Sequence, residues 1–144
     1  MEYETVQGTS VPKIGLGTWQ TAGQETYGAV RTALAAGYRH IDTAQAYNNE
    51  RHVGNAIHDA DVDREDIFLT TKVRPDRFRP GRLKRSVANS IRRVDTTCVD
   101  LLLLHWPNPL ADLRETMEAM ADLVERVDVR HVGVSNFSKK RLMK

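Results

Sequence analysis

Four residues with side chains suited to acid–base chemistry lie at or just after short extended segments of the chain: Asp42, Tyr47, Lys72 and His105. A lysine that closes an apolar strand is costly to bury unless a charge compensates it, and Asp42 on the neighbouring strand, at the same level, is the expected partner of Lys72. An ammonium group beside a phenol favours loss of the phenolic proton, so it would make Tyr47 a competent acid near neutral pH. His105 could hydrogen-bond a substrate carbonyl in the same pocket. Together the four groups would deliver a proton to a carbonyl oxygen while a hydride reaches its carbon.

Each of these residues also has a structural interpretation when it is taken alone. Asp42 could cap the following helix, Tyr47 could be an amphipathic lid residue, and Lys72 could extend its ammonium group to solvent. His105 alone is more often a hydrogen-bonded structural histidine than a catalyst. Because all four occur on successive strands, a joint site is favoured over four separate structural roles.

The elements that must position these residues alternate between extended and helical patterns. Extended apolar segments begin near Ile14, His40, Ile67, Val99 and Val129. A helical pattern fills each gap, and a repeat of about 30 residues is typical of βα units with parallel strands. Two short extended runs around Gly8-Thr9-Ser10, between Tyr3 and Ile14, predict a β-hairpin ahead of this alternation.

Periodicity also predicts which residues the elements bury. The fourth helix is expected to bury a stripe of apolar side chains, namely Leu113, Met117, Met120 and Val124. Gly37 is expected to end the first helix in the left-handed conformation. The segments Phe68–Val73 and Asp100–His105 are nearly continuous in apolar or β-forming residues, so we expect strands buried on both faces.

Two parallel α/β architectures fit this pattern. Five βα units in about 140 residues would suit a doubly wound, flavodoxin-like sheet. The same units could instead be the first part of a (β/α)₈ barrel, which typically needs about 250 residues. Periodicity does not distinguish these two folds, but the polar residues at the strand ends can.

The composition indicates a globular chain in a reducing, cytoplasmic setting. Hydrophobic residues make up 40% and charged residues 28% of the 144 residues, and the net charge is +2. The longest apolar run, Leu101–Leu104, is far shorter than the ~20 residues of a membrane-spanning helix. The N-terminus has no secretory segment, Cys98 is the only cysteine, and the histidines lack metal-ligand spacing. We therefore expect no membrane, nucleic-acid or metal partner.

One segment departs from this charge balance. Residues 77–93 contain seven basic residues and no acidic residue. A phosphate or RNA patch is one interpretation. Leu83, Val87 and Ile91 take the buried side of the predicted helix, which leaves the arginines on its outer faces. A solvated helix surface is therefore favoured.

Six segments, spread over nearly the whole chain, carry a family resemblance. They are Val11–Trp19, Gly37–Ala44, Tyr47–Glu50, Thr70–Val73, Asp100–Pro107 and Gly133–Phe137. In these segments the sequence resembles the aldo-keto reductases, and most closely the prokaryotic branch that contains 2,5-diketogluconate reductases. The resemblance implies a (β/α)₈ barrel and NADP(H)-dependent reduction of aldehydes or ketones.

The resemblance also implies a role for each site residue. Asp42, Tyr47, Lys72 and His105 would form the catalytic tetrad, with Tyr47 as the general acid. Ser135 and Asn136 would hydrogen-bond the nicotinamide carboxamide, and Thr18 and Asp42 would also contact the cofactor. Trp19, Trp106 and His105 would line the substrate pocket.

The chain departs from the family pattern in three respects, one of which is the one-sided charge of residues 77–93 described above. Residues 1–144 would be the N-terminal portion of the barrel, a hairpin and strands one to five, without strands six to eight or the segment that grips the 2′-phosphate. A non-catalytic fragment that self-associates through its unpaired strand edges is therefore the alternative to a carbonyl reductase. In addition, Val127 stands where such sequences usually have glycine, and it would strain the turn if a positive φ is required.

Overall fold

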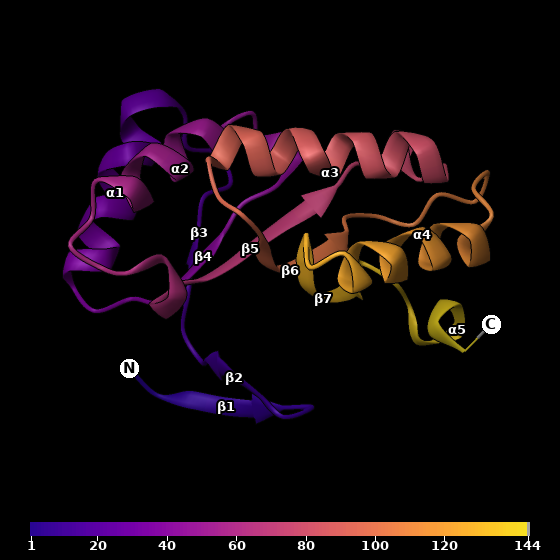
Figure 1. The fold of residues 1–144 in the computed structure, drawn as a ribbon, viewed down its shortest axis with the longest axis horizontal. Helices are drawn as coiled ribbons and strands as arrows, with labels where there is room; N and C mark the ends of the chain where they lie inside the picture. The colour runs from indigo at the N-terminus through magenta and orange to yellow at the C-terminus, as the bar shows by residue number, and fades with distance from the viewer. Residues whose placement is uncertain (144) are drawn as a thin grey trace.

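The computed structural model describes residues 1–143, so Lys144, the last residue of the expected barrel segment, lies outside the described residues. The chain alternates strands and helices after an N-terminal hairpin (Figure 1). The strands are β1 (Tyr3–Val6), β2 (Thr9–Pro12), β3 (Leu16–Gly17), β4 (His40–Asp42), β5 (Phe68–Val73), β6 (Val99–Leu104) and β7 (Val129–Val134). The helices are α1 (Gly23–Ala35), α2 (Glu50–His58), α3 (Pro80–Val94), α4 (Leu113–Glu125) and α5 (Lys139–Leu142), with 3₁₀ turns η1 (Gln45–Tyr47), η2 (Arg64–Asp66) and η3 (Pro75–Arg77).

Strands β3 to β7 form one parallel sheet in sequential order. This order excludes the flavodoxin-like alternative and is that of the first part of a (β/α)₈ barrel. The register corrects one expectation. Asp42 lies opposite Thr70, two residues before Lys72, so the two charged residues are not level across the sheet. The long side chain of Lys72 spans the offset.

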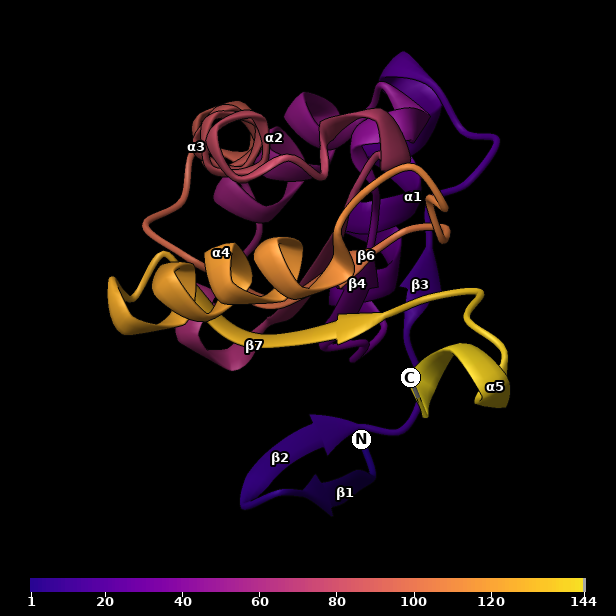
Figure 2. The ribbon, with the colours of Figure 1, turned by 90° about the vertical axis from the view of Figure 1, so that its right-hand side faces the viewer.

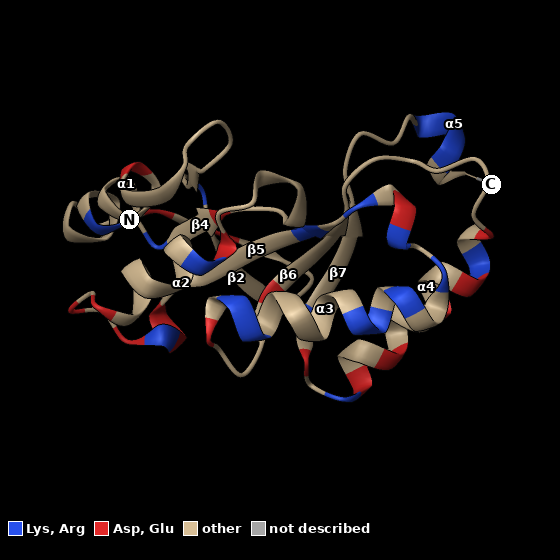
Figure 3. Ribbon diagram, turned by 90° about the horizontal axis from the view of Figure 1, so that it is seen from above, with Lys and Arg blue, Asp and Glu red and all other residues tan. Residues whose placement is uncertain are grey.

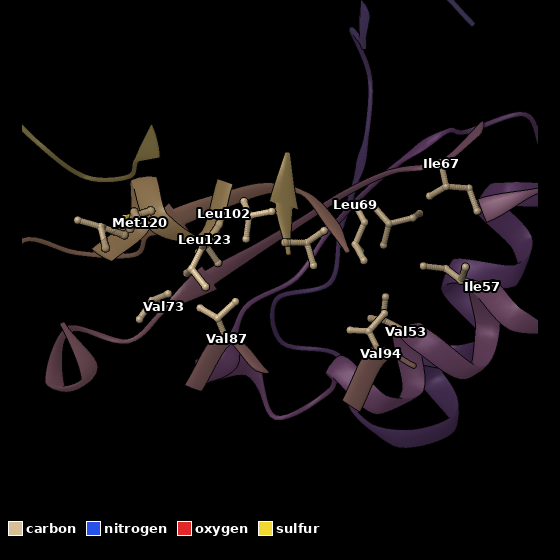
Figure 4. Packing of buried hydrophobic residues seen from close by; sticks show 14 of the residues in the cluster. Val53, Ile57, Ile67, Leu69, Val73, Val87, Val94, Leu102, Met120 and Leu123 are labelled. Atoms are coloured by element: carbon tan, nitrogen blue, oxygen red, sulfur yellow. The ribbon is translucent and has the colours of Figure 1, made fainter. Parts of the chain in front are cut away.

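Helices α1 to α4 cover one face of the curved sheet and pack against one another in chain order, whereas α5 lies apart from this layer (Figure 2). Leu102 and Leu104 of β6 are fully buried in this layer, whose packing is drawn in Figure 4. Leu101 and Leu103 point to the other face and are only half-buried. All of β5 is buried, as expected. The expectation of two covered faces was wrong for β6, because no element among residues 1–143 covers the inner face beside it.

The predicted hairpin forms and lies at the end of the sheet where the strands begin (Figure 1). Thr9 Oγ1 and His131 Nε2 are 3.0 Å apart, which ties the hairpin to β7. The opposite end of the sheet, where the strands finish, remains accessible to small molecules. No helix within the described part of the chain is long and apolar enough to cross a membrane.

Three helices are followed by residues with positive φ: α1, α3, whose C-cap Asp95 has a φ of +56°, and α4. Gly37 after α1 has a φ of +98°, as predicted, and Val127 after α4 has a φ of +64°. At Val127 the backbone N–H donates to Val124 O at 3.0 Å, and the next N–H, of Asp128, donates to Leu123 O at 3.1 Å. This paired bonding is the Schellman motif, which favours glycine at the position that Val127 occupies. The expected strain at Val127 is therefore present in the turn.

Candidate active site

Lys72, the penultimate residue of β5, places its ammonium group at the centre of the site. The residue is only 7% exposed. Its Nζ donates to both carboxylate oxygens of Asp42 at 2.7 Å and to the Thr43 carbonyl at 3.0 Å. The carboxylate therefore compensates the buried charge of the lysine at the strand end.

Tyr47 approaches the same ammonium group from η1, in the loop after β4. Lys72 Nζ lies 3.4 Å from the Tyr47 hydroxyl oxygen and 5.0 Å from the centre of its ring. The hydroxyl oxygen therefore accepts from a cation, which leaves the phenolic proton available to another acceptor. The structure thus brings together the tyrosine, lysine and aspartate that the strand ends predicted.

His105 follows β6 and stands on the other side of Tyr47, with the two ring centres 5.6 Å apart in an edge-to-face arrangement. Burial, and to a smaller extent the nearby Lys72 ammonium, lower the pKa of His105, while the Asp42 carboxylate opposes them. The lowered pKa of His105 favours its neutral imidazole, which offers one N–H donor. Its Nδ1 has no hydrogen-bond partner among residues 1–143.

These groups open into a cavity of about 650 Å³ at the ends of the strands. The cavity is lined by Trp19, Gln20, Thr21, Asp42, Ala46, Tyr47, Lys72, His105, Trp106, Ser135 and Asn136. Trp19 and Trp106 are 67% and 53% exposed and stand at its rim. Every predicted site residue except Thr18 therefore reaches one cavity.

Thr18 lies underneath the cavity. It is 1% exposed, and its hydroxyl donates to the Asp42 carbonyl at 3.0 Å. On the opposite side of the cavity Asn136 has a φ of +62°, and its side-chain amide donates to the His105 carbonyl at 2.8 Å. These bonds fix the backbone on both sides of the tetrad.

Buried polar residues next to Tyr47 hold its loop, and sequence reasoning assigned them no role. Asn49 is fully buried and donates from Nδ2 to the Thr18 carbonyl at 2.8 Å, while its Oδ1 accepts from Thr43 Oγ1 at 2.7 Å. Gln45 donates from Nε2 to the hydroxyls of Ser86 and Ser90 on α3, each at 3.1 Å. A feature of the sequence could have pointed to these residues. Amide and acidic residues, at Gln45 and at residues 48–50, stand between two apolar elements.

The arrangement supplies a proton donor, a fixed cation and a neutral imidazole around one cavity. Such a set can protonate an oxygen that enters the cavity and stabilise negative charge that develops on it. Among residues 1–143 no group of three or more histidine, cysteine or acidic residues is placed to hold a metal ion.

Comparison with known proteins gives a consistent result. The profile of the aldo/keto reductase family matches residues 13–144. An aldo-keto reductase of Mycolicibacterium smegmatis is 45% identical over 137 residues, which are 94% of this chain and 50% of that protein. Methylglyoxal reductase DkgA of Escherichia coli is 38% identical over 139 residues, or 95% of this chain and 50% of that protein.

A crystal structure of a putative 2,5-diketo-D-gluconic acid reductase B superposes with a TM-score of 0.91 and 41% identity, over 94% of this chain and 48% of that one. The chain spans about half the length of the curated relatives that it matches. Its hairpin and five parallel strands align with the first half of the aldo-keto reductase barrel. The chain belongs to the aldo/keto reductase family.

Proposed function

We propose that this chain carries the proton-donating part of a carbonyl reductase site, in which NADP(H) supplies the hydride and an aldehyde or ketone is the substrate. The observation that carries the proposal is the Tyr47 hydroxyl 3.4 Å from the Lys72 ammonium, which is itself bound to Asp42. The names of the relatives, among them a methylglyoxal reductase and a putative 2,5-diketo-D-gluconic acid reductase, support small carbonyl compounds as the substrate class.

The residues present fit a nicotinamide carboxamide. That group has one N–H₂ donor and one carbonyl acceptor, and Ser135 and Asn136 line the cavity. Asn136 uses its Nδ2 toward His105 and Ser135, so its Oδ1 faces no donor among the described residues. Ser135 and Asn136 would hold the amide, and the bound nicotinamide would supply the hydride.

The proton path follows from the contacts of Tyr47. A substrate carbonyl oxygen placed between Tyr47 and His105 would accept a hydrogen bond from each of them. As negative charge develops on that oxygen, Tyr47 gives up its proton, and the Lys72 ammonium stabilises the phenolate that remains. Asp42 keeps the ammonium in place throughout, and the aromatic rings of Trp19 and Trp106 would limit access of water to the reacting centre.

A graft tests the proposal. Residues 1–144 would replace the matching half of the E. coli methylglyoxal reductase, and NADPH oxidation would be followed with methylglyoxal as substrate. We expect turnover by the graft and a loss of roughly 10²–10⁴-fold in kcat for Tyr47→Phe, the range that a positioned proton donor contributes.

Tyr38→Phe removes a phenolic hydroxyl outside the cavity, so it is the matched control and should retain most of the activity. Melting curves would show that the graft and both variants fold. Near-parental kcat in a folded Tyr47→Phe graft would remove Tyr47 from its proposed role.

A second function is favoured by one observation. Within residues 1–143 the outer edge of β7 has no pairing strand, and the inner face beside it is only half-buried. A non-catalytic barrel fragment that associates with other copies would bury both features.

A further inference from the structure

A recess of about 300 Å³ lies between η3 and the outer surface of α3, away from the strand-end cavity. It is lined by Asp76, Arg77, Arg82, Arg85, Ser86, Asn89 and Arg93. None of these residues lines the candidate active site. Figure 3 shows blue segments along α3, where the basic residues of this surface lie. Four guanidinium groups thus converge on one small concavity, which we call the arginine recess.

Two of the four arginines are held in place by buried partners. Arg93 donates to Glu50 Oε1 at 2.6 and 3.0 Å and to the Ser90 hydroxyl at 3.2 Å. Arg77 Nη1 lies 3.4 Å from Gln45 Oε1. Glu50 and Gln45 are only 2% and 5% exposed, so these anchors are fixed by the core. A binding site with pre-positioned side chains loses less conformational entropy when a ligand binds.

The charges of the arginine recess do not balance. Glu50 offsets Arg93, and the single carboxylate of the lining, Asp76, is paired with Arg74 at 3.1 Å. Arg77, Arg82 and Arg85 form no ion pair with any described residue. Like charges three residues apart on a helix repel each other, and an anion between them would relieve the repulsion.

We propose that the arginine recess binds a small anion that carries two or more phosphate groups. Guanidinium groups match phosphate oxygens in paired hydrogen bonds, and three uncompensated cations suit more than one phosphate. The recess is a single concavity of about 300 Å³, and on another side of α3 Lys84 is paired with Asp122 at 2.5 Å. A compact ligand therefore fits better than a nucleic-acid strand, which needs an extended track of charge. The sequence of this segment favoured a solvated helix surface, because a linear sequence reveals neither the concavity nor the buried partners of Arg77 and Arg93.

Calorimetry with inorganic tripolyphosphate at low ionic strength tests this on the 144-residue chain. We expect saturable binding and a higher melting temperature with tripolyphosphate. The double variant Arg82→Gln/Arg85→Gln should bind it at least about 10-fold more weakly, since one hydrogen bond to a charged group contributes about a factor of ten in affinity. Arg92→Gln removes an exposed arginine of the same helix outside the arginine recess and should change affinity less than about two-fold.

Several results would overturn the proposal. They are the absence of a thermal shift with the unmodified chain at millimolar tripolyphosphate, an equal loss in Arg92→Gln, and tighter binding of a single-stranded RNA than of tripolyphosphate. Comparison with ATP separates the two sources of the ligand, because a nucleotide site would favour ATP and a polyphosphate site would not. The probe contains no nicotinamide, and Tyr47→Phe should leave its binding unchanged, so the outcome is independent of carbonyl reduction.

Discussion

The ammonium group of Lys72 has more acceptors around it than protons to donate. Three protons face the two Asp42 oxygens, the Thr43 carbonyl and the Tyr47 hydroxyl. The contact with Tyr47 is the longest of the four, at 3.4 Å. Asp42 and Thr43 therefore fix the position of the ammonium group. The Tyr47 hydroxyl lies close enough to be influenced by its charge, and its own proton is not used in this contact. In the proposed reaction, Asp42 would act through its ion pair with Lys72.

His105 should make stability depend on pH in a defined direction. Its pKa is lowered by burial and by Lys72, and the pKa of His40 is lowered mainly by burial. Below about pH 6.5, the usual histidine value, the unfolded chain binds more protons than the folded chain. Stability from these residues is therefore complete above that pH and is lost as the pH falls through the lowered pKa values.

Urea unfolding between neutral and mildly acidic pH measures this effect, and NMR of the imidazole signals assigns it. We expect the His105→Gln variant to lose less stability on acidification than the unmodified chain. A His105 titration midpoint above about 6.5 would contradict the argument.

The four residues of the tetrad could be predicted because the ends of parallel strands meet at one edge of the sheet. Their partners could not. Asn49 contacts Thr18, which follows β3, and Gln45 contacts Ser86 on α3, so both contacts depend on how segments distant in sequence pack against the loop. The catalytic roles themselves stay predictions until activity is measured.

At the scale of the elements, α4 shows how a helix face can be misjudged. Of the expected stripe, which runs from Leu113 to Val124, Met120 is fully buried as predicted, but Leu113 is 37% exposed. The buried residues are Thr116, Ala119, Met120 and Leu123. The helix turns this way because Thr116 donates to the Phe78 carbonyl at 3.0 Å and the small Ala119 allows close approach. A count of large apolar residues omits both.

The turn after α4 offers a stabilising substitution. Val127 is 68% exposed and has a φ of +64°, so Val127→Gly removes strain without removing core contacts. We expect it to raise the free energy of unfolding by about 1 kcal/mol, measured by urea denaturation. Gly37→Ala is the mirror control, because Gly37 has the same role after α1 and an added Cβ meets no atom within 4 Å. It should destabilise by a similar amount, and equal stability of all three proteins would argue against backbone strain.

The contact between α2 and α3 depends on a glycine for a different reason. A Cβ on Gly54 would lie 2.6 Å from the carbonyl carbon of Val94, so Gly54→Ala forces two backbones apart. We expect a loss of roughly 1–3 kcal/mol in unfolding free energy. Gly28→Ala in α1, where a Cβ meets nothing within 4 Å, should instead stabilise by up to about 1 kcal/mol. Similar effects of both changes in thermal and urea unfolding would show that the helices can separate freely.

At the scale of the whole molecule, the chain brings the four residues of the proposed tetrad to one cavity on an open sheet. The sheet runs from β3 to β7, and in residues 1–143 each of these two strands pairs on one side only. The relatives are about twice as long. The first five strands therefore hold the proposed proton donor, while no described residue is assigned to the remote end of a dinucleotide, whose contacts would add binding energy.

A polypeptide of these 144 residues should consequently self-associate and turn over NADPH slowly. The edge of β7 presents unpaired backbone groups beside the half-buried Leu101 and Leu103, and a second copy could cover both. Light scattering during gel filtration should show dimers or larger species. An NADPH-consumption assay should show weak binding and little turnover, because loss of contacts to the remote end of the cofactor weakens the orientation of the reacting ring. Leu103→Lys places a charge on the inner face and should shift the chain toward monomer, whereas Leu110→Lys, at a 92% exposed loop position, should not. A monomer with ordinary reductase turnover would exclude the fragment interpretation and leave the carbonyl reductase.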